Sequence, residues 1–213
     1  PHAKTLEDSE SRLLIEQFLS TRIEENAGVA ARLDALLAGL EGAQSGEVIS
    51  RFFEGARLGD SDAQFDLSIL VLVKGLGNMD PAEAREMLRR AAESGKAKAK
   101  DLRAILLVET EPIEARRLLE TAAKENHLGS LYHLGLFVAN GTGGSSDPEI
   151  AATHFEAAAT QGDPRAMFAL GRCYETGFGK MADVTEATRW LNMAAALGYP
   201  AALAWCQARE VEV

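Results

Sequence analysis

Apolar and small residues between positions 163 and 198 follow the spacing of two helices joined by a glycine turn. The first set recurs at i, i+4, i+5 and i+8, on one face of a helix, and consists of Ala166, Leu170, Gly171 and Tyr174. The second set lies on one face of a later helix and consists of Ala187, Trp190, Leu191, Ala194 and Ala195. Asp163 and Pro164 are typical of a helix start, Gly177 and Gly179 of a break, and Gly198 of a helix end. The segment therefore predicts a helix–turn–helix unit.

The same pattern is present 36 residues earlier, without a gap. Residues 127–162 align with 163–198 so that the Leu-Gly pair at 134–135 precedes Leu170 and Gly171 by this offset. The G-x-G turn at 141–143 precedes the one at 177–179 in the same way. A fixed period of this length is the signature of a helical repeat array.

The rest of the chain continues this phase with larger departures. The expected copies cover residues 24–59, 60–95, 96–126, 127–162 and 163–198. The copy at 96–126 is shortened and carries ETEP in place of the glycine turn. Before the array, residues 1–23 contain an amphipathic stretch, Leu6 to Ile23, which we expect to form a helix that caps the first copy. After it, residues 199–213 begin another first helix, so a single domain over 1–213 is expected.

These residues resemble the Sel1-like repeat family, relatives of the tetratricopeptide repeats. The family's run of A-x-x-x-L-G-x-x-Y-x-x-G-x-G, an acidic residue, A-x-x-W and AA-x-x-G is matched from Ala166 to Gly198. The resemblance extends over residues 24–212. It implies an all-α fold, a right-handed α/α superhelical solenoid of about five repeats with a capping helix at each end, whose usual role is to bind other proteins.

The charge and hydropathy of the chain restrict its partners. A net charge of −10 and a pI of 5.0 argue against nucleic acid and anionic membranes. The densest apolar run, LSILVLV at 67–73, is too short to span a bilayer, so no membrane insertion is expected. No leader is visible and the sequence opens at Pro1. We expect a bacterial periplasmic protein whose leader has been trimmed, with the cytoplasm as the alternative.

The stretch CYETGFGK at 173–180 is the strongest candidate for small-molecule chemistry, but its glycines recur as a turn at 141–143. A phosphate-binding loop follows a strand and continues G-K-[ST], whereas here a helix precedes it and Met181 follows Lys180. Cys173 and Cys206 fall on neighbouring first helices, where either a disulfide or two free thiols are compatible with the sequence.

The histidines and carboxylates form no recognisable catalytic or metal-binding pattern. His2, His127, His133 and His154 do not have the spacing of metal ligands. We therefore expect no metal, no cofactor and no catalytic residues.

Stacked first helices of a solenoid form a concave groove, the usual binding surface of such arrays. Positions two before and two after the buried leucine of each first helix are expected to face this groove, and they are Phe65 and Ile69, Tyr132 and Leu136, and Phe168 and Arg172. His133 and Arg165 are expected at its rim. Aromatic residues and arginine dominate many binding interfaces. The alternative is that these side chains only pack between repeats.

The sequence therefore predicts a non-enzymatic scaffold or adaptor that binds a partner protein in the groove. Such a protein would serve as a bacterial envelope or secretion-related regulator, or as an immunity protein that inhibits a secreted toxic effector. The acidic balance favours a partner with a basic face, and a homodimer is a further alternative. The alternative function is that of the cysteine-rich branch resembling these repeats, which hydrolyses β-lactams. Its regular cysteine pairs are missing from this sequence.

Overall fold

The computed structural model describes residues 53–74 and 79–210, and in this part of the chain every regular element is a helix. The chain divides into two compact units, Pro1–Gly95 and Lys96–Val213 (unit 1 and unit 2). None of the described helices is long and apolar enough to cross a bilayer. The expected cap at Leu6–Ile23, the copy at 24–59 up to residue 52, and residues 75–78 of the next copy lie outside the described residues.

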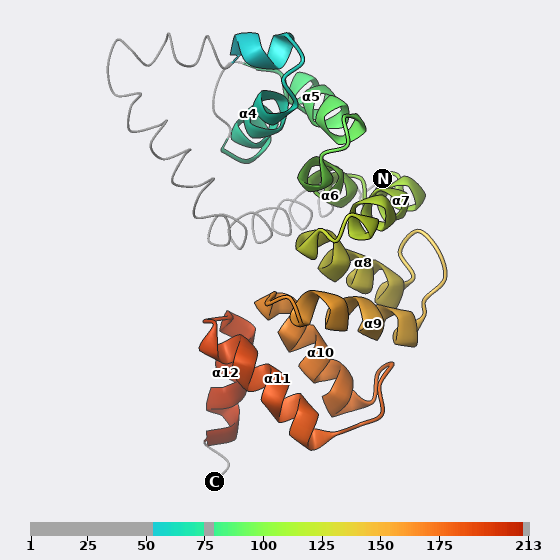
Figure 1. Cartoon of the computed structure of the whole chain (residues 1–213), viewed down its shortest axis with the longest axis vertical. Helices are drawn as coiled ribbons and strands as arrows, with labels where there is room; N and C mark the ends of the chain where they lie inside the picture. Colours follow the sequence, from blue (N-terminus) through green and yellow to red (C-terminus); the bar gives the residue numbers. More distant parts are fainter. Residues whose placement is uncertain (1–52, 75–78, 211–213) are drawn as a thin grey trace, which may run out of the picture. The chain divides into compact units, whose positions relative to one another are not determined.

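Unit 1 contains α4 (Ser61–Lys74) and α5 (Pro81–Glu93), which pack against each other (Figure 1). The side chain of Asp80 caps α5 by accepting the Ala82 N–H at 2.8 Å. A small core forms between the helices from Ala56, Ala63, Leu67 and Met87. These two helices are the pair expected within residues 60–95.

Unit 2 is a succession of helices in which each packs on the next (Figure 1). They are α6 (Ala97–Leu106), α7 (Pro112–Lys124), α8 (Leu128–Asn140), α9 (Pro148–Ala159), α10 (Pro164–Thr176), α11 (Val184–Ala196) and α12 (Pro200–Glu210). The first helix of one repeat also contacts the first helix of the next, as α6 and α8 do. The division into repeats within one domain stays a prediction.

The glycine turns connect the two helices of a repeat in the same way twice. Gly141 and Gly143 have φ of 72° and 68°, and Gly177 and Gly179 have φ of 76° and 65°. This left-handed region is costly for residues with a Cβ. A Cβ on Gly143 would also lie 2.2 Å from the Pro112 carbonyl oxygen, and one on Gly179 would lie 1.9 Å from that of Pro148. Each turn therefore packs on the start of the preceding repeat's second helix.

Small residues allow the two helices of a repeat to pack closely. A Cβ on Gly135 of α8 would lie 2.5 Å from the Phe155 ring of α9, and one on Gly171 of α10 would lie 2.6 Å from Leu191 Cγ of α11. The surrounding core is built largely from alanine and leucine, and Leu119 and Leu170 are fully buried in it. This core holds the first helices, which carry the candidate site, in fixed positions.

Candidate partner-binding face

The residues expected in the groove lie on α4, α8 and α10. In unit 1, Phe65 is buried and Ile69 is half-buried on α4. In unit 2, α8 carries Tyr132, His133 and Leu136, and α10 carries Arg165, Phe168 and Arg172. We refer to the surface formed by Tyr132, Leu136, Phe168 and Arg172 as the first-helix face.

Aromatic and cationic side chains of the site contact one another across successive first helices. The Arg165 guanidinium carbon lies 4.8 Å from the centroid of the Tyr132 ring, within the range of a cation–π interaction. The Tyr132 ring meets His133 edge-on at 5.3 Å. Phe168 packs on Tyr199, just before α12, with 5.4 Å between the ring centroids. These contacts order the aromatic side chains before any partner binds.

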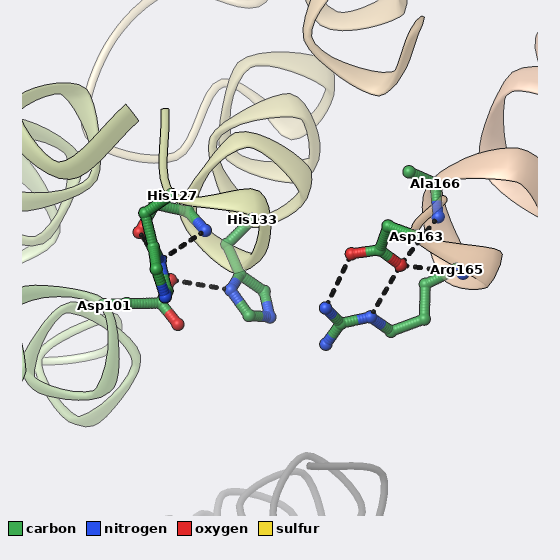
Figure 2. Close-up of polar contacts among 7 residues, drawn as sticks. Asp101, His127, His133, Asp163, Arg165 and Ala166 are labelled. Atoms are coloured by element: carbon green, nitrogen blue, oxygen red, sulfur yellow. Dashed lines mark hydrogen bonds and ion pairs between the residues drawn. The ribbon is translucent and has the colours of Figure 1, made fainter. Parts of the chain in front are cut away.

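Arg165 forms a buried ion pair with the residue that caps its own helix (Figure 2). Its Nε and Nη2 donate to Asp163 at 3.1 and 2.7 Å, and both residues are only 5% exposed. Asp163 Oδ1 also accepts the backbone N–H of Arg165 and of Ala166, at 2.9 and 3.3 Å. Charge-assisted bonds of this kind fix the guanidinium over Tyr132.

A second polar cluster joins α6 to α8. The fully buried carboxylate of Asp101 accepts bonds from Ser130 Oγ at 3.1 Å and from His133 Nδ1 at 2.9 Å (Figure 2). His127, the N-cap of α8, lies with Nδ1 2.9 Å from Ser130 Oγ and accepts the Ser130 N–H at 3.3 Å. The hydrogen bond to Asp101 thus orients the His133 ring, which also contacts the ring of Tyr132.

The residue types of this cluster match a Ser-His-Asp triad, but their geometry differs from it. In a triad, the serine hydroxyl is reachable by substrate and bonds to the histidine that the aspartate orients. Here Ser130 is fully buried, its hydroxyl donates to Asp101, and His133 bonds that same carboxylate. Among the described residues, no group of three His, Cys, Asp or Glu side chains is arranged to hold a metal ion. The cluster is a buried junction between two first helices.

Both cysteines are free thiols in this structure, one of the two states compatible with the sequence. Cys173 is buried in the core of unit 2, and burial raises the pKa of its thiol to about 11. Cys206 is half-buried, and its Sγ donates to Asn192 Oδ1 at 3.4 Å. The Cys173 thiol is therefore packed in the apolar core, and the Cys206 thiol is hydrogen-bonded to Asn192.

Exposure separates the expected site residues into two groups. Tyr132, Leu136 and Phe168 are half-buried, and Arg172 is exposed and paired with Glu175. By contrast, His133 and Arg165 are buried, as the alternative of packing between repeats expects. The first group can contact a partner, whereas the second holds the first in place.

Asp101 and Ser130 were not identified from the sequence, although one signal points to them. Asp101 occupies the position in α6 that Tyr132 occupies in α8 and Phe168 in α10. An acidic residue in an otherwise aromatic position calls for a polar partner once it is buried. His133, one residue after Tyr132, supplies that partner.

Four segments of the sequence match the model of one known protein family. The model of the Sel1 repeat matches residues 61–96, 106–127, 129–163 and 164–199, together more than half of the chain. No curated protein matches the sequence. The matched segments begin close to the expected repeat boundaries in each case but 96–126, where the match covers mainly the second helix.

Solved structures with the same helical-repeat architecture include two of appreciable identity. A protective antigen of uropathogenic Escherichia coli with an SLR fold is 25% identical, with a TM-score of 0.70 over 78% of this chain and 37% of its own. A Sel1 repeat protein from Oxalobacter formigenes is 30% identical, with a TM-score of 0.66 over 71% of this chain and 62% of its own. The chain thus spans less than two thirds of either protein.

A third structure is more distant. The immunity protein Pa5087 from Pseudomonas aeruginosa is 18% identical, with a TM-score of 0.51 over 74% of this chain and 60% of its own. At this identity the likeness concerns the fold. The expected fold class, all-α with helix pairs of the solenoid type, is confirmed by these matches.

Proposed function

Because the chain belongs to the Sel1 repeat family, we propose that it is a non-enzymatic scaffold that binds a partner protein on its first-helix face. Proteins of this family are generally protein-interaction scaffolds. The first helices of successive repeats would supply the contacts, and the second helices would hold them in place. The sequence also predicts Phe65 and Ile69 of α4 as groove residues, and their part in binding stays a prediction.

The observation that carries this proposal is the paired arrangement on α8 and α10. Tyr132 and Phe168 occupy equivalent positions, each half-buried and each held by an ordered neighbour, Arg165 or Tyr199. Ordered aromatic side chains lose little conformational entropy on binding, which is why they often dominate interface energies. The face is therefore preorganised for an apolar or aromatic anchor of a partner.

Two roles fit such a scaffold, inhibition of a secreted toxic effector and regulation in the bacterial envelope. The immunity protein with a similar fold supports the first role. A net charge of −10 favours a partner with a basic face and faster association at low salt. A periplasmic location, with the cytoplasm as the alternative, is part of this proposal.

The test begins with the partner, captured from the native source and identified by mass spectrometry, and then measured by calorimetry against purified variants. Tyr132→Ala combined with Phe168→Ala should weaken binding by about 100-fold, because each removes an anchor of roughly 1–2 kcal/mol. Met193→Ala, a change to an exposed side chain on α11, is the matched control and should leave the affinity unchanged. Unchanged affinity in a folded double variant would rule out the first-helix face.

A further inference from the structure

A second surface of unit 2 carries exposed apolar side chains that the first-helix face does not explain. Ile113 is 75% exposed, Ile150 49%, Met181 89% and Val184 72%. All four lie at the glycine-turn side of the helix pairs, at the starts of α7, α9 and α11 or in the turn before α11. We call the surface formed by these four residues the turn edge.

The turns and helix starts that carry these four side chains follow one another along one edge of unit 2. The turn at 141–146 packs on the start of α7, since Gly143 meets the Pro112 carbonyl and Arg116 Nη1 donates to Ser145 O at 3.1 Å. The turn at 177–182 packs on the start of α9 through Gly179 and Pro148 in the same way. Figure 1 shows both turns on the same side of unit 2. Each turn therefore bridges the start of one second helix to the start of the next.

The fold does not require an apolar residue at the positions of Ile113 and Ile150, because sister repeats carry polar ones there. The position of Ile113 is occupied by Glu149 in α9 and by Thr185 in α11. The position of Ile150 is occupied by Glu114 in α7 and Glu186 in α11. Helices α9 and α11 begin normally with these residues. Ile113 and Ile150 thus contribute little to folding, and exposed apolar patches commonly mark interaction sites.

Acidic side chains accompany the apolar ones along the turn edge. Glu111 lies two residues before Ile113, Glu149 directly before Ile150, and Asp183 directly before Val184, and none of the three forms an ion pair within the described part of the chain. The nearby cations are paired: Arg116 with Glu120, Arg117 with Glu114, Lys180 with Glu156 and Arg189 with Glu186. The charge left over along this edge is therefore negative.

We propose that the turn edge is a second docking surface, which binds a basic amphipathic segment of another protein. Apolar side chains of that segment would cover Ile113, Ile150, Met181 and Val184, and its Lys or Arg residues would pair with Glu111, Glu149 and Asp183. Charge complementarity selects this occupant, because an acidic segment would bring like charges together. The surface is separate from the first-helix face, so the protein would engage two partner segments.

The experiment uses the full chain and a panel of labelled 15-residue amphipathic peptides, with Leu, Ile, Phe or Met on one face and Lys or Arg between them. Fluorescence anisotropy should show binding that weakens as salt is raised. Replacing Lys and Arg in a binding peptide by Glu, or its apolar residues by Ser, should abolish the binding. The triple variant Ile113→Ser, Met181→Ser and Val184→Ser should weaken it by at least about tenfold, since interface anchors account for most of the affinity.

Two controls keep the proposal falsifiable. Leu197→Ser, at the other end of α11 and 58% exposed, should bind the peptides like the wild type. The Tyr132→Ala and Phe168→Ala variant should also bind them normally, so failure of the first-helix face and failure of the turn edge are distinguishable. The proposal is overturned if no basic peptide binds, if the Glu versions bind equally, or if the triple variant retains full affinity. It is also overturned if light scattering finds a dimer that the triple variant dissociates, since a second copy then covers the edge.

Discussion

Helices α8 and α10 occupy equivalent places in successive repeats. Their residues agree closely on one side of the helix and differ on the other. On the side that faces the second helix, both present a buried Leu-Gly pair, and both end in a turn with two glycines at positive φ. On the side that faces neighbouring first helices, their polar groups are unlike each other. The repeat thus maintains one side of the helix as structure and varies the chemistry of the other.

The polar groups of the varied side differ in where their partners come from. In α8, Ser130 and His133 bond to Asp101, which belongs to α6. In α10, Arg165 bonds to Asp163, the N-cap of its own helix. The first set of hydrogen bonds links two repeats, whereas the bond between Arg165 and Asp163 is made within one, although the Arg165 guanidinium also lies over Tyr132 of α8. Residues on the side that faces neighbouring first helices can therefore change to suit a particular partner. Such changes leave the helix–turn–helix unit intact.

The largest expected effect comes from breaking the ion pair between Asp163 and Arg165 at the start of α10. Asp163→Ala removes a helix cap and the carboxylate that accepts two bonds from buried Arg165, which should lower the free energy of unfolding by about 3 kcal/mol. Arg165→Met should cost less, about 2 kcal/mol, because the buried Asp163 carboxylate loses its counter-charge but still accepts two backbone N–H groups. Denaturant unfolding measures both. Equal losses in the two variants would contradict this account of the pair.

The next largest effect concerns the side that the two helices share. Gly171→Ala and Gly135→Ala should each destabilise the protein by about 2 kcal/mol, because the new Cβ overlaps Leu191 or Phe155. At Gly171 the backbone oxygen of Ala187 also lies 3.3 Å away, which limits relaxation.

A double mutant tests whether the overlap with Phe155 causes the loss. Gly135→Ala with Phe155→Ala should cost less than the sum of the single changes, with a coupling of at least about 1 kcal/mol. Additive losses would mean that the close approach of α8 and α9 is not what Gly135 provides.

The sequence alone could predict the side of each first helix that faces the second helix, which α8 and α10 have in common. Helical spacing, the aspartate caps, the G-x-G turns and the terminal glycine are local signals, and each appears in the structure where the pattern places it. The inner face expected for the last second helix is also present, with Ala187, Trp190, Leu191 and Ala194 buried and Ala195 half-buried.

The varied side depends on contacts between residues far apart in the sequence, which spacing does not reveal. His133 and Asp101 are 32 residues apart, and their bond depends on how closely α6 and α8 pack. Spacing placed His133 and Arg165 at the rim of a groove, but a long polar side chain can instead be buried when a carboxylate is within reach. The residues left accessible, Tyr132, Leu136, Phe168 and Arg172, follow only once these buried pairs are known.

The smallest expected effect compares the second helices, where His154 of α9 occupies the position of Trp190 in α11. Partial burial lowers the pKa of His154. The charge of Glu120 raises this pKa and that of Arg116 lowers it, both by less than burial does. The unfolded chain therefore takes up this proton first, so folding weakens as the pH falls from the ordinary histidine pKa of about 6.5 through the lower value in the folded state. His154→Gln cannot take up the proton, so its unfolding free energy should decline less than that of the wild type between neutral and mildly acidic pH. Because the other histidines and the carboxylates are common to both proteins, the difference between the two pH profiles isolates His154. Identical profiles would show that α9 tolerates a charge at the position where α11 buries an indole.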